Sequence, residues 1–99
     1  MLNIEKKADG EKLVIALEGR LDTTTAPQLE SELGTCLDGV KELVFDLEKL
    51  EYISSAGLRV LLSAQKTMNN QGSMVVKNSI EEIREIFDVT GFSDILTIE

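Results

Sequence analysis

Short apolar runs alternate with amphipathic segments along this chain, and the alternation restricts its fold more than any other feature. Residues 13–17 (LVIAL) and 41–47 (KELVFDL) have the composition of buried strands, and the first is expected to be covered on both faces. The segment between them places its apolar residues on one helical face: Ala26, Leu29, Leu33, Cys36 and Leu37. Strands separated by such a helix pair in parallel through a crossover, so the chain is predicted to form an α/β fold.

The remaining segments continue this pattern. Residues 3–7 and the turn signal at 8–10 predict an antiparallel hairpin with the first apolar run. After the second run, the sequence predicts a helix, a strand, a helix and a final strand over residues 56–71, 73–76, 79–91 and 94–99. The order β-β-α-β-α-β-α-β predicts a single domain over residues 1–99, with a mixed, partly parallel sheet covered by helices.

Several residues signal where the helices begin and end. Thr24 or Thr25 is expected to cap the first helix, and Gly39 to end it. Ser79 and Glu82 have the spacing of a capping box and predict the start of the last helix.

Charge and composition exclude several classes of function. The chain has 10 basic and 18 acidic residues, a net charge of −8, which argues against nucleic acids and anionic membrane surfaces as partners. No apolar run approaches the roughly 18 residues of a membrane span, and charges interrupt the N-terminus, so a cytoplasmic protein is expected. The lone cysteine, Cys36, is interpreted as a small core residue.

The absence of histidine narrows the chemistry further. A chain without histidine lacks Ser–His hydrolase chemistry, most zinc sites and phosphohistidine relays. With no readable pair of catalytic carboxylates and no phosphate-cradling glycine loop, we expect neither an enzyme nor a bound cofactor or metal.

Two adjacent serines precede a predicted helix in the stretch YISSAGL, residues 52–58. In sheets of this type, partners gather at the loops that follow parallel strands. The first turn of a helix offers about four unpaired N–H groups and the positive end of the helix dipole. Ser54 and Ser55 therefore suit capping, and a phosphoryl group would also be held there. Both interpretations remain open from the residues alone.

Three motifs resemble the STAS domain, in particular the bacterial anti-sigma factor antagonists. They are G-x-L-D in residues 19–22, D-L-x-x-L-x-Y-I-S-S-A-G-L in residues 46–58 and F-x-x-T-G in residues 87–91. The resemblance covers essentially the whole chain, in order and with normal spacing.

The resemblance implies a phosphorylation site at Ser55, the serine two positions before the motif glycine. Ser54 stands where the family usually has aspartate, and it is the less favoured acceptor. Asp22 matches a family acidic residue near this loop, although a turn or capping role suits it equally. The implied partner-binding surface comprises Asp22, Thr23, Ser54, Ser55, Ala56, Gly57, Leu58 and Arg59.

The resemblance also implies a switch. The unphosphorylated protein would bind an anti-sigma factor, a serine kinase with an ATPase fold, and so release a sigma factor. Phosphorylation would break that complex, and a PP2C-type phosphatase would restore it. The alternative hypothesis is a STAS scaffold that is not phosphorylated and regulates a larger signalling or transport assembly.

Overall fold

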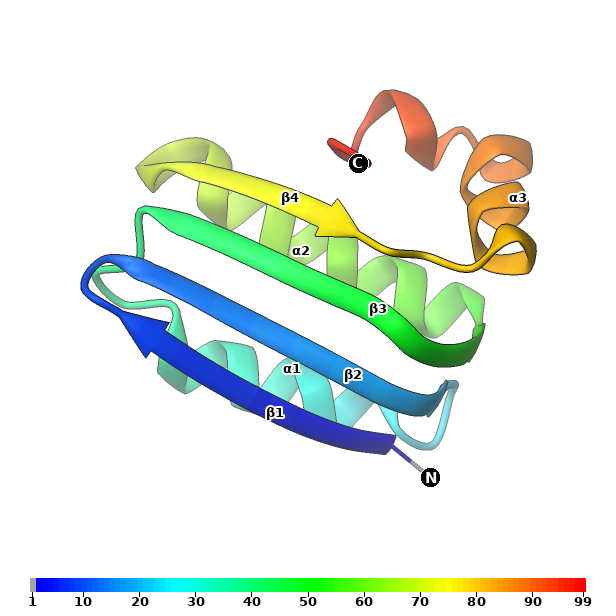
Figure 1. Ribbon diagram of the computed structural model, residues 1–99, viewed down its shortest axis with the longest axis horizontal. Helices are drawn as coiled ribbons and strands as arrows, with labels where there is room; N and C mark the ends of the chain where they lie inside the picture. The colour runs from blue at the N-terminus through cyan, green and yellow to red at the C-terminus, as the bar shows by residue number, and fades with distance from the viewer. Residues whose placement is uncertain (1) are drawn as a thin grey trace.

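Four strands form one mixed sheet in the order β1-β2-β3-β4 (Figure 1). The computed structural model describes residues 2–99, and Met1, the first residue of the expected domain, lies outside them. Strand β1 pairs antiparallel with β2, whereas β2–β3 and β3–β4 are parallel. The elements are β1 (Leu2–Asp9), β2 (Lys12–Leu21), α1 (Ala26–Cys36), β3 (Glu42–Ile53), α2 (Ser55–Gln71), β4 (Ser73–Lys77), α3 (Glu81–Thr90) and the 3₁₀ helix η1 (Phe92–Asp94).

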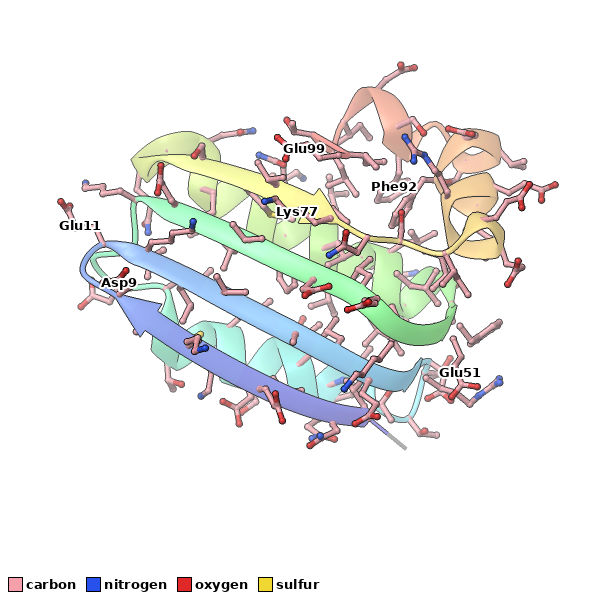
Figure 2. All side chains as sticks on the ribbon, viewed as in Figure 1. Asp9, Glu11, Glu51, Lys77, Phe92 and Glu99 are labelled. Atoms are coloured by element: carbon pink, nitrogen blue, oxygen red, sulfur yellow. The ribbon has the colours of Figure 1, made fainter. Side chains whose placement is uncertain are left out.

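The predicted fold class and order of elements are confirmed, with the final strand reduced to a single bridge. Ile98 pairs in parallel with Val76 of β4, whereas Asp94 ends η1 and residues 95–97 of the expected strand are turn or irregular structure. Lys77 and Glu99 lie close together at this edge of the sheet, and their charged groups are 4.0 Å apart (Figure 2).

Helices α1 and α2 pack on one face of the sheet, and no helix of the described residues lies over the other face (Figure 1). On β2, Leu13, Ile15 and Leu17 are buried under the helices, whereas Val14 and Ala16 on the open face are only half-buried. The expectation that residues 13–17 are covered on both faces is therefore wrong. Val14 of β2 lies beside Val44 of β3, so its apolar side chain has an apolar neighbour on the open face of the sheet.

Strand β3 is longer than predicted. The predicted strand stops at residue 47, whereas residues 48–53 continue the sheet as far as Ile53. Register shifts opposite Ala16–Glu18 and Gly19–Arg20 bring extra residues of β3 against β2. Buried residues consequently recur every third position at Leu47, Leu50 and Ile53, which hides the period of two that a regular strand would show.

Two predicted helix boundaries are wrong. Helix α1 ends at Cys36, and Gly39 lies in the following turn with a φ of 79°. Ile80, not Ser79, precedes α3, and the buried hydroxyl of Ser79 has no hydrogen-bond partner within residues 2–99. Asn78, with a φ of 61°, turns the chain before the expected capping box can form.

Cys36 is half-buried and packs against the core, in line with its interpretation as a small core residue. Burial raises the pKa of its thiol, which keeps it in the neutral form at physiological pH.

Candidate functional site

Parallel pairing brings the β2–α1 and β3–α2 loops together at one end of the molecule (Figure 1). The backbone N–H of Ser54, after β3, donates to the carbonyl of Leu21, the last residue of β2, at 2.9 Å. The hydrogen bond fixes the serine loop against the loop that contains Asp22 and Thr23.

The structure separates the two serines. Ser54 is the N-cap of α2, with extended backbone angles, and its Oγ accepts a hydrogen bond from the N–H of Gly57 at 3.3 Å. Ser55 is the first residue of the helix, and its side chain is exposed. Among residues 2–99, no hydrogen bond uses the Ser55 hydroxyl, whereas the half-buried Ser54 hydroxyl is occupied in capping. Ser55 is therefore the more available of the two hydroxyls.

Gly57 and Leu58, expected on the partner-binding surface, are buried beneath it. A Cβ atom at Gly57 would lie 2.7 Å from Leu21 Cγ and 2.9 Å from Ile53 Cγ1, so only glycine lets the helix start pack this closely on the strand ends. Leu58 is only 5% exposed and belongs to the core. Both residues support the serine loop from beneath.

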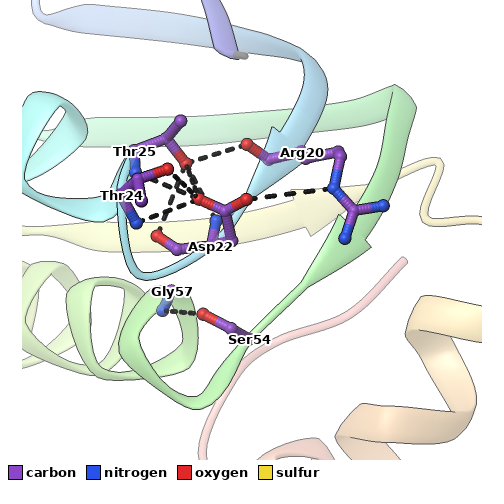
Figure 3. A network of polar contacts seen from close by, with 6 residues as sticks. All are labelled: Arg20, Asp22, Thr24, Thr25, Ser54 and Gly57. Carbon is purple, nitrogen blue, oxygen red and sulfur yellow. Dashed lines mark hydrogen bonds and ion pairs between the residues drawn. The ribbon is translucent and has the colours of Figure 1, made fainter.

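Asp22 organises the neighbouring loop (Figure 3). Its Oδ1 accepts hydrogen bonds from the backbone N–H and the hydroxyl of Thr24, at 3.0 and 2.7 Å, and from the N–H of Thr25 at 3.1 Å. The buried hydroxyl of Thr25 accepts from the Asp22 N–H and donates to the carbonyl of Arg20, both at 2.8 Å. This is an Asx turn leading into α1, so the turn role predicted for Asp22 is the one its Oδ1 performs.

The second carboxylate oxygen of Asp22 faces Arg20, whose Nε is 3.8 Å away. The hydrogen bond from the Thr24 hydroxyl, aided by those from the Thr24 and Thr25 backbone, holds the pKa of Asp22 below its ordinary value. The Arg20 guanidinium also lies over the ring of Tyr52, 4.3 Å from its centroid. Sequence analysis missed this pair, because the register shift that places Tyr52 opposite Arg20 cannot be inferred from residue patterns.

A shallow hollow of about 360 Å³ lies between the start of α1 and the first turns of α2. Three of the predicted surface residues, Thr23, Ala56 and Arg59, line it together with residues that were not predicted as part of the surface, among them Pro27, Glu30 and Ser63. The helical spacing of Ala56, Arg59 and Ser63 was available in the sequence, but the packing of α2 beside α1 was not.

Within residues 2–99, no three His, Cys, Asp or Glu side chains are grouped so that they could share a metal ion. Of the helices in the same range, none combines the length and apolarity required to cross a bilayer.

Known proteins share both this sequence pattern and this fold. The provisionally named anti-sigma factor antagonist BtrV of Bordetella bronchiseptica is 40% identical over 93% of this chain and 80% of its own length. An anti-sigma factor antagonist from Mycobacterium paratuberculosis superposes with a TM-score of 0.89, covering 99% of this chain and 85% of that one, at 23% identity. The Bacillus cell fate determinant SpoIIAA in its phosphorylated form gives a TM-score of 0.75 over 100% and 91% of the two chains, at 20% identity.

The profile of the STAS domain matches residues 3–99, which include every described strand and helix apart from the first residue of β1. The chain therefore belongs to the STAS domain family.

Proposed function

We propose that the protein is an anti-sigma factor antagonist of the bacterial cytoplasm, and that it acts by binding rather than by catalysis. In its unphosphorylated form it binds an anti-sigma factor, a serine kinase with an ATPase fold, and so frees a sigma factor. The names of BtrV and of the Mycobacterium paratuberculosis protein support the antagonist role. The docking surface is formed by Asp22, Thr23, Ser54, Ser55, Ala56 and Arg59, with Gly57 and Leu58 beneath it.

The exposure of Ser55 at the first position of α2 is the observation that carries the proposal. A phosphoryl group there gains about −1.5 to −2 charges and lies near the unpaired N–H groups of the first helical turn. The helix can therefore tolerate the modification while the docking surface becomes strongly anionic. Burying that charge against a partner without a matching cation weakens the complex, and a PP2C-type phosphatase reverses the effect.

Ser54 is the point at which the chain departs from its family. As a neutral cap it satisfies the Gly57 N–H as an aspartate would, but it places no charge beside Ser55. The departure favours one alternative, a STAS scaffold that organises an assembly without being phosphorylated.

Incubation with ATP and candidate anti-sigma factor serine kinases from the same genome, followed by mass spectrometry, tests the proposal. We expect one phosphoryl group on the wild type, none on Ser55→Ala and one on Ser54→Ala. Ser63→Ala is a matched control, because Ser63 is also an exposed serine of α2. In a binding assay, Ser55→Ala should retain the kinase, and Ser55→Asp should bind it more weakly.

Two results would contradict the assignment. Equal phosphate incorporation by Ser55→Ala and wild type would exclude Ser55 as the acceptor. Retained kinase binding with no phosphate on any serine would favour the scaffold over the switch.

A further inference from the structure

The outer face of α3 is apolar at its centre and acidic at its rim. Val89 is 81% exposed, more than any other large hydrophobic side chain in residues 2–99, while Ile83 and Phe87 bury the opposite side of the helix. A shallow hollow of about 350 Å³ on the outer face is lined by Glu82, Glu85, Ile86, Val89 and Thr90. Their spacing of three and four residues makes the hollow a stripe along two turns of the helix.

This end of the chain also carries most of the net charge. Residues 81–99 contain six carboxylates and one cationic side chain, Arg84, which accounts for five of the eight net negative charges. Within the described residues, none of the α3 carboxylates lies in an ion pair with a lysine or arginine. Unpaired charges of one sign attract an oppositely charged surface over about 8 Å at physiological ionic strength.

We propose that this face of α3 binds an amphipathic basic helix of a partner protein. Leucine-like side chains of the partner would pack against Val89 and Ile86, and its lysines or arginines would pair with Glu82 and Glu85. A helix suits the hollow, because a stripe of side chains along one helix forms the ridges and grooves into which a second helix packs.

The acidic charge of the α3 face favours a basic helix over a second copy of the chain or a lipid surface. A second copy of the chain would bring two acidic α3 faces together, and an anionic lipid surface would be repelled in the same way. The hollow shares no residue with the docking surface around Ser55, so the inference stands independently of the proposed switch.

An amphipathic peptide of about five helical turns, with leucines on one face and lysines on the other, is a suitable probe. A scrambled peptide of the same composition controls for charge alone. Titration of each into the isotope-labelled full chain, followed by methyl NMR and calorimetry, locates the contact and measures its affinity. We expect saturable shifts at the Ile86 and Val89 methyl groups and an affinity that falls with salt.

Val89→Ser should weaken binding of the amphipathic peptide by about tenfold. Glu85→Gln should weaken it less and flatten its salt dependence. Ile95→Ser is the matched control, because Ile95 is an exposed hydrophobic residue outside the hollow. Thermal unfolding confirms that each variant remains folded, and Ser55→Ala should bind the peptide like the wild type.

Four outcomes would overturn the inference. One is equal affinity for the scrambled peptide, and another is equal affinity of wild type and Val89→Ser. The third is a set of shifts centred on the open face of the sheet or on the Ser55 loop. Self-association that Val89→Ser abolishes, measured by sedimentation, would replace the proposed partner with a second copy.

Discussion

Gly57→Ala tests whether the start of α2 is held in place by close packing on the strand ends. The added methyl group would lie 2.7 Å from Leu21 Cγ and 2.9 Å from Ile53 Cγ1. Carbon atoms in good contact are about 3.5–4.0 Å apart, so the new atom intrudes by roughly 0.8 Å on Leu21. Leu21 and Ile53 are 0% and 2% exposed, so neither side chain can relieve the contact by turning into solvent.

Overpacking of this kind costs about 1–3 kcal/mol. Alanine is favoured over glycine inside a helix by about 0.8–1 kcal/mol, which offsets part of that cost. We therefore expect Gly57→Ala to lower the free energy of unfolding by up to about 2 kcal/mol. For a domain of this size, this corresponds to a fall of up to about 16 °C in the melting temperature.

Gly34→Ala provides the matched control. Gly34 is a helical glycine of α1, and apart from its chain neighbours and the backbone of its own helix, no heavy atom lies within 4 Å of the Cβ that the substitution would add. The same exchange there should stabilise the protein by about 0.5–1 kcal/mol. Urea unfolding of both variants gives the comparison. If the two substitutions shift stability in the same direction, close packing is not what requires glycine at position 57.

Two further substitutions probe the loops around Ser55. Ser54→Ala removes the cap of α2, and because the cap hydrogen bond is long at 3.3 Å, the loss should be about 0.5–1 kcal/mol in urea unfolding. An unchanged midpoint would show that the cap contributes nothing. Asp22 has a lowered pKa when folded, so its ionised form stabilises the protein above the unfolded pKa near 4. This stabilisation is lost as the pH falls through the folded pKa. Asp22→Asn should therefore show a weaker dependence of stability on pH between about 5 and 2, and an identical acid profile would contradict the assignment of the Asp22 hydrogen bonds.

Local patterns were sufficient to predict most of the fold and the location of the serine loop. Alternating apolar runs and one-sided helical segments predict the order of elements, because parallel strands need crossovers. The small and polar residues at 54–57 indicate a helix start, and Ser54 does cap it.

Features that depend on tertiary contacts could not be predicted from these patterns. The extension of β3 to Ile53 depends on register shifts against β2, and these alter the spacing of buried residues. Ser79 and Glu82 have the spacing of a capping box, but the left-handed conformation of Asn78 displaces the helix start by one residue. The burial of Gly57 follows from the approach of α2 to Leu21, which lies far from it in sequence.

The bridge between Ile98 and Val76 protects part of the β4 edge from pairing with a strand of another molecule. Val76 donates its N–H to the carbonyl of Thr97 and accepts the N–H of Glu99, both at 2.8 Å. These two groups would otherwise face outward from β4, where an exposed strand edge is a template for intermolecular sheet growth. Residues 97–99 thus cover part of the β4 edge. The nearby Lys77–Glu99 pair adds charged groups to this edge, and charge there disfavours aggregation.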